Sequence, residues 1–167
     1  MNLDKLFNNK NYLKKQIETY VNKKQIRISE PNKLLALAHL EKAKQNLLFF
    51  DKNFKDEEFL DWLIVILYYV VYHCALALIS KKGFYSKNHL ATLILLVQNY
   101  DVSKKEINLM EELCITRKDA ELYTVLKSER QNASYSSKTN FTIKKVGNYK
   151  NEVISFLYKT EDLLKEE

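Results

Sequence analysis

The sequence predicts an all-α protein, an up-and-down helical bundle of four to five core helices with an extra helix at the N-terminus. Two glycines and one proline in 167 residues leave few turns, which favours a few long helices over a sheet. Apolar residues recur at steps of three and four along most of the chain, as in amphipathic helices. The third observation is an unbroken apolar run, WLIVILYYVVYHCALALI, at residues 62–79.

The run at 62–79 is predicted to be the central helix of the bundle. It contains no charge, glycine or proline, so a helix there would be apolar on every face and would need to be surrounded. It is also long enough for a membrane span. However, Tyr68, Tyr69 and Tyr72 fall in its middle, whereas the tyrosines of spanning helices favour the membrane interfaces. We therefore interpret it as a buried core helix and predict no membrane partner.

Residues 1–28 are predicted to form a basic amphipathic helix that precedes the bundle at 31–167. Apolar residues recur at helical spacing from Leu3 to about Lys24. Between Lys10 and Arg27 six cations accompany a single acid, Glu18, so this face is either solvated or contacts phosphates. We favour the solvated face. The sequence leaves open whether the helix packs on the bundle or on another molecule.

Local signals place the remaining helices. Pro31 suits a first helical turn, Ser86 and Ser103 are good N-caps, and Gly83 after two lysines is a good C-terminal stop. Residues 56–58 are acidic and suit the first turn of the central helix. The helices are thus expected near 31–51, from the acids at 56–58 to the lysines before Gly83, and near 87–100, 104–114 and 119–132, with a polar loop at 133–142 and a last helix that includes Val146.

Composition limits the classes of function. The net charge of +6 favours an acidic partner such as nucleic acid. Cys74 and Cys114 lie in apolar surroundings at no metal-ligand spacing, and no apolar signal opens the chain, so we expect reduced thiols and a cytoplasmic location. The sequence has no Gly-rich phosphate loop, HExxH or GxSxG, so neither a metal nor a cofactor is predicted.

Residues 127–150 are the region that most favours a binding site. Cations there alternate with aromatic residues in a polar context, a combination that holds phosphates and stacks unpaired bases. An ordinary solvated loop has the same composition, and that alternative stays open. The candidate RNA-binding residues are Lys127, Arg130, Gln131, Lys138, Lys144 and Lys145, with Tyr135, Phe141 and Tyr149 as the interleaved aromatics.

The order of these features resembles the HEPN domains of prokaryotes, in particular the small stand-alone group. Two segments carry the resemblance over about residues 31–165: YYVVYHCALALISKKGFYSKNH at 68–89 and Arg130-Gln131-Asn132-Ala133-Ser134-Tyr135. The resemblance implies a helical bundle that commonly forms a homodimer. In many members it also implies a metal-independent ribonuclease with an Arg, a polar residue, three further residues and a His.

The catalytic motif of the family is incomplete here. Arg130 and Gln131 match it, but Tyr135 stands in place of the His. A tyrosine, with a pKa near 10, is a poor base at neutral pH. Arg130 and Tyr135 also lie five residues apart, about 140° around a regular helix, so they cannot converge unless the helix ends between them or two chains contribute. His89 is the histidine that could supply the missing base; a capping or structural role is its alternative.

Two functions follow from the sequence. The first is an RNA-directed HEPN protein. Its candidate activity is metal-independent cleavage of RNA, with Arg130, Tyr135 and His89 as candidate catalytic residues. The second is a non-catalytic helical interaction module, because the resemblance implies pairing with a small nucleotidyltransferase in toxin-antitoxin-like systems. Loss of the motif histidine suits binding without cleavage.

Overall fold

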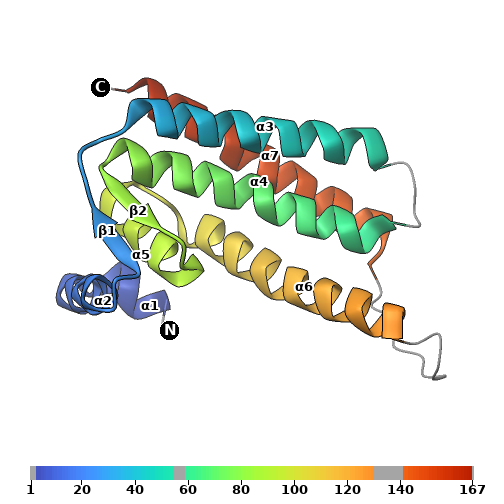
Figure 1. The fold of residues 1–167 in the computed structure, drawn as a ribbon, viewed down its shortest axis with the longest axis horizontal. Helices are drawn as coiled ribbons and strands as arrows, with labels where there is room; N and C mark the ends of the chain where they lie inside the picture. The colour runs from blue at the N-terminus through green and yellow to red at the C-terminus, as the bar shows by residue number, and fades with distance from the viewer. Residues whose placement is uncertain (1–2, 55–58, 130–140, 167) are drawn as a thin grey trace.

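The computed structural model describes residues 3–54, 59–129 and 141–166, without the side chains of Leu3, Thr116 and residues 118–129. Over this part of the chain, seven helices and one pair of short strands form the bundle (Figure 1), which confirms the predicted fold class. The elements are α1 Leu3–Asn8, α2 Lys10–Asn22, β1 Ile26–Ile28, α3 Lys33–Asn53, α4 Leu60–Lys81, β2 Phe84–Ser86, α5 His89–Asn99, α6 Lys104–Glu129 and α7 Ile143–Lys165.

Helix α4 is the centre of the bundle. It packs against α3, α5, α6 and α7, and Leu63, Ile64 and Leu67 are at most 1% exposed. The expectation that this helix is covered on every face is wrong, because Trp62 is 49% exposed and Tyr69 is 36% exposed. Length and a mean hydropathy of 2.2 would also allow α4 to cross a membrane, but 72% of that window is buried inside the bundle, as in a core helix.

The basic N-terminal segment folds onto the bundle. The helix predicted from Leu3 to Lys24 is two helices, because Asn9 interrupts it and caps α2 by accepting a hydrogen bond from the backbone N–H of Tyr12 at 2.9 Å. Both helices contact α5, and Leu6 of α1 is 1% exposed. This placement answers the question that the sequence left open.

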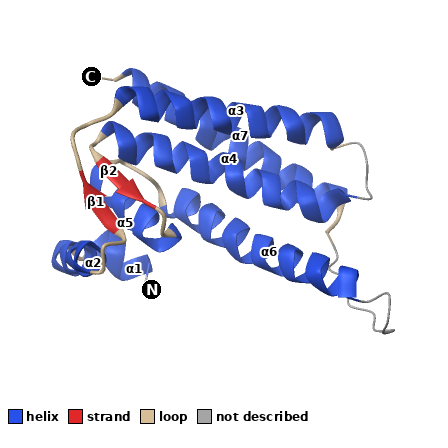
Figure 2. Cartoon of the chain, viewed as in Figure 1, coloured by secondary structure: helices blue, strands red, loops and turns tan. Residues whose placement is uncertain are grey.

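Two three-residue strands, which the sequence analysis did not predict, join the N-terminal segment to the bundle (Figure 2). Strand β1 pairs antiparallel with β2, so that Arg27 lies opposite Tyr85 and Ile26 opposite Ser86. Ile26 is buried in the main core. The strands therefore bring residues from before α3 beside residues that follow α4.

The caps of α5 and α6 differ in how well they were predicted. Ser86 belongs to β2, and Asn88 is the N-cap of α5, where its Oδ1 accepts from the N–H of Ala91 at 3.0 Å. Ser103 caps α6 as predicted, through a reciprocal pair with Glu106. Helix α6 then continues to Glu129, so the predicted break between residues 114 and 119 is wrong. Most of the predicted loop at 133–142, and the acids at 56–58, lie outside the described residues.

Candidate functional site

The predicted site residues fall into three groups. One group lies outside the described residues, so the proposed Arg130 and Tyr135 constellation has no structural counterpart in this part of the chain; its members are Arg130, Gln131, Tyr135 and Lys138. The backbone of Lys127 belongs to α6, without a described side chain. Lys144, Lys145 and His89 are described.

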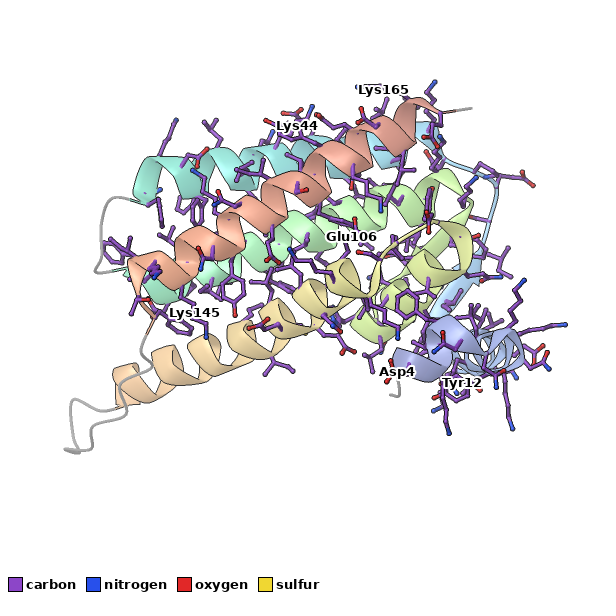
Figure 3. The ribbon with its side chains drawn as sticks, turned by 180° about the vertical axis from the view of Figure 1, so that it is seen from behind. Asp4, Tyr12, Lys44, Glu106, Lys145 and Lys165 are labelled. Atoms are coloured by element: carbon purple, nitrogen blue, oxygen red, sulfur yellow. The ribbon has the colours of Figure 1, made fainter. Side chains whose placement is uncertain are left out.

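Lys144 and Lys145 are exposed in the first turn of α7. Lys145 lies at the end of the bundle opposite the labelled Asp4 and Tyr12 of the N-terminal helices (Figure 3). Its Nζ lies 5.8 Å from the ring centroid of Tyr149, a cation–π contact. Neither lysine lines the cavity that contains His89. The described structure therefore does not bring Lys144 and Lys145 together with His89.

His89 is the first residue of α5 and lines a cavity of about 630 Å³ between α4, α5 and α6. Six of its eleven lining residues are aromatic or cationic, and we call it the tyrosine–arginine cavity. Those side chains are Tyr68, Tyr69 and Tyr72 of α4, Lys87 from the connection after β2, His89 of α5 and Arg117 of α6.

The tyrosines share one side of α4 because of their spacing. Tyr68 and Tyr72 are one turn apart, so their rings stack at 5.6 Å between centroids and 11° between planes. The His89 ring lies 5.8 Å from the Tyr68 ring and 6.4 Å from the Tyr72 ring. Helix α5 thus sets its first side chain against the tyrosines of α4.

Arg117 completes the cavity from α6, and the sequence analysis missed it. Its guanidinium carbon lies 4.4 Å from the ring centroid of Tyr68, and its Nη1 donates to the hydroxyl of Tyr69 at 3.4 Å. One signal could have singled it out, because the chain has three arginines among its 27 cations: Arg27, Arg117 and Arg130. Planar guanidinium groups are the cations best suited to aromatic stacking and phosphate binding.

Burial opposes the ionisation of Tyr68 and Tyr72. It raises the pKa of Tyr68 well above the ordinary value, against the opposing charge of Arg117. Burial also raises the pKa of Tyr72, although a hydrogen bond with Thr92 acts in the other direction. Both tyrosines therefore offer rings and protonated hydroxyls at neutral pH and are poor bases. Burial likewise raises the pKa of Glu111, which lines the same cavity.

Fold and cavity together define a class: an α-helical bundle with a cationic and aromatic cavity on its central helix. Among the described residues, no three His, Cys, Asp or Glu side chains are grouped to hold a metal ion. A scan against protein-family models finds no match to this chain, and a search of curated proteins finds none either. The relation to HEPN domains therefore stays a prediction.

Proposed function

We propose that this protein binds single-stranded RNA in the tyrosine–arginine cavity. The observation that carries the proposal is the Arg117 guanidinium held 4.4 Å over the Tyr68 ring at the side of an open cavity. Proteins that bind single strands combine cations, which hold the phosphates, with aromatic faces, on which bases stack. The net charge of +6 supports the same class of ligand.

The cavity has both kinds of group within reach of a ligand. Tyr69 is 36% exposed at its side, so its ring is accessible, whereas Tyr68 is 5% exposed and serves as the platform for Arg117. Lys87 is exposed and adds a second cation from another element. Arg117 and Lys87 would hold phosphates, and Tyr69 would stack a base.

The test is RNA binding by purified protein, measured by fluorescence anisotropy with an unstructured labelled oligouridylate. Arg117→Ala should weaken binding about tenfold or more, and Arg117→Lys should restore only part of it, because lysine keeps the charge but not the planar stacking group. Lys105→Ala is the matched control, since Lys105 is an exposed cation of the same helix outside this cavity. Equal effects of Arg117→Ala and Lys105→Ala would overturn the proposal.

We further propose that any cleavage of the bound RNA is metal-independent, as the HEPN resemblance implies. His89 lines the described cavity and is the candidate proton acceptor for a ribose 2′-hydroxyl. Both of its ring nitrogens are buried, so RNA would reach them only after the surrounding side chains move. The candidate residues Arg130 and Tyr135 complete the proposed set. Incubation of a mixed single-stranded RNA in excess EDTA should give cleavage that Arg130→Ala and His89→Gln abolish and Tyr135→Phe reduces. Intact RNA with folded wild-type protein would leave a binding protein without nuclease activity.

A specific observation favours a second candidate function, an interaction module. Helix α3 exposes large apolar side chains near its two ends: Leu34 is 82%, Leu48 56% and Phe49 53% exposed, with the exposed Glu41 and Gln45 between them. Leu34 and Leu48 lie fourteen residues apart, which places them about 40° from each other around the helix axis and thus on one side of the helix. A face of this kind suits a protein partner. The resemblance to HEPN domains makes a nucleotidyltransferase-type protein, in a toxin-antitoxin-like pair, the partner to test.

Coexpression with the protein encoded next to this one tests the second candidate. A stable complex that Leu34→Asp with Leu48→Asp disrupts, and that Arg117→Ala leaves intact, would establish the interaction module. RNA binding by the same two variants separates the two functions, because only the arginine variant should lose it. The absence of any complex would leave the RNA-directed function as the candidate.

A further inference from the structure

A second cationic pocket lies directly beside the tyrosine–arginine cavity. It measures about 300 Å³ and is lined by residues on both sides of the β1 and β2 pair. We call it the strand pocket; its lining residues are Lys24, Gln25, Arg27, Tyr85, Lys87 and Asn88. Three of these six side chains are cations and none is acidic, so the pocket favours an anionic ligand.

The strand pocket repeats the chemistry of the cavity. The guanidinium carbon of Arg27 lies 6.0 Å from the ring centroid of Tyr85, which the strand register places opposite it. Both arginines whose side chains are described, Arg27 and Arg117, therefore lie over tyrosine rings. The remaining cations of the N-terminal segment are lysines, so the one arginine of this segment is at the pocket.

The C-terminal cap of α2 places Lys24 at the strand pocket. The backbone φ angle of Lys24 is 56°, in the left-handed region that residues other than glycine adopt much less often. Two backbone hydrogen bonds hold this turn. The N–H of Lys24 donates to the carbonyl oxygen of Val21 at 2.8 Å, and the N–H of Gln25 donates to the carbonyl oxygen of Tyr20 at 2.9 Å. These are the two bonds of a Schellman cap, in which the residue after the C-cap adopts the left-handed conformation, so the end of α2 leaves Lys24 lining the strand pocket with Arg27.

The two sites are continuous. Lys87 and Asn88, which connect β2 to α5, line both the strand pocket and the tyrosine–arginine cavity. A ligand with repeated phosphates can therefore contact Arg117, Lys87 and Arg27 in succession. A single small anion would use one site only, whereas a nucleic acid strand would use both.

We propose that single-stranded RNA bound in the cavity continues over Lys87 into the strand pocket, where Lys24 and Arg27 hold its phosphates. This inference rests on the proposed RNA binding and extends it to the N-terminal segment. The sequence analysis interpreted the basic face of this segment as solvated. The inference changes that interpretation for Lys24 and Arg27 only. The aromatic partner, Tyr85, comes from β2, distant in sequence.

Salt-dependent binding to an oligouridylate of about 12 nucleotides tests the inference. The double variant Lys24→Gly with Arg27→Gln removes two cations, and glycine suits the left-handed backbone at position 24. We expect about tenfold weaker binding and a slope of log K against log salt that is smaller by about 1.4, from two lost phosphate contacts on a single strand. The matched control, Lys14→Gln with Lys15→Gln, removes two exposed cations of α2 outside the pocket and should change both quantities much less.

The outcomes separate the two proposals. This inference alone is overturned if RNA binding depends on Arg117 but the strand-pocket double variant weakens it no more than the α2 control double variant does. If wild-type protein does not bind the oligomer at low salt, both the inference and the proposed function are overturned. Thermal unfolding of each variant, measured in parallel, identifies any loss of binding that follows from misfolding.

Discussion

The Nδ1 atoms of His39 and His73 lie 3.1 Å apart, and this contact joins α3 to α4. One ring must donate and the other accept, so protonation of both rings breaks this hydrogen bond. Burial, with smaller contributions from His39 and Lys42, lowers the pKa of His73 to about 4 from 6.5. Burial also lowers the pKa of His39. The pair is therefore neutral in the folded protein at pH 7.

This pair predicts a loss of stability in mild acid. A histidine whose pKa is lowered by folding stabilises the protein above its unfolded pKa, and this stabilisation is lost as the pH falls from about 6.5 towards 4. We expect the free energy of unfolding, measured with urea, to fall by about 1 to 2 kcal/mol between about pH 7.5 and about pH 5. His73→Gln should remove most of this dependence, and an unchanged dependence in that variant would contradict the assignment.

Gly83 is expected to tolerate no side chain. Its φ is 78°, and a Cβ atom there would collide with the backbone carbonyl of Ser29 and approach the nitrogen of Pro31 within 3.1 Å. Gly83→Ala should therefore destabilise the protein by at least about 2 kcal/mol in urea unfolding. Gly147→Ala is the internal control, because its Cβ would meet Phe54 at an ordinary 3.5 Å within α7. That change should be neutral or stabilising by up to about 1 kcal/mol.

Tyr69 should matter for RNA and little for folding. Its ring is 36% exposed beside the cavity, so Tyr69→Ala removes a stacking surface while leaving the buried Tyr68 in place. We expect binding of an oligouridylate to weaken by about 1 to 3 kcal/mol. Tyr158→Ala, at a tyrosine of α7 that is 61% exposed, is the matched control and should not alter binding. Similar losses in both variants would exclude a specific role of the cavity ring.

The exposed apolar residues of α3 predict self-association of the isolated protein. Leu34, Leu48 and Phe49 are exposed on this helix, and in the absence of the partner proposed above a second copy of the chain would cover them. We expect a homodimer at micromolar concentration in sedimentation velocity, converted to monomer by Leu34→Asp with Leu48→Asp. Ile28→Asp with Tyr158→Asp adds the same charge at exposed apolar positions elsewhere and should leave the dimer intact. A wild-type protein that is monomeric throughout would remove the homodimer from the proposal.

Features that depend on local sequence were predicted best. The apolar run at 62–79 identified α4, and Ser103 correctly located the start of α6. Ser86 was mistaken for a cap because it and Asn88 are both good N-cap residues two positions apart, and the strand that removes Ser86 from the helix has three residues, too few to show an alternating pattern.

Features that depend on tertiary packing could not be predicted. The sequence indicates neither that Arg27 lies opposite Tyr85 nor that Arg117 of α6 lies over Tyr68 of α4. Both contacts depend on strand register and on how the helices cross. The tyrosines of α4 read as apolar core, although their rings also form one wall of a cavity. The proposed role of Arg130 and Tyr135 stays a prediction, since they lie outside the described residues.

The pairing of β1 with β2 has a practical consequence for any shortened version of the chain. A protein that began after Ile28 would leave the backbone groups of Phe84, Tyr85 and Ser86 without their partner strand. It would also uncover the surface of α5 that α1 and α2 occupy, together with the core positions filled by Leu6 and Ile26. An unpaired strand edge next to newly exposed apolar surface favours aggregation. We therefore expect a chain that lacks its first 28 residues to aggregate, so point substitutions are the better way to test their role.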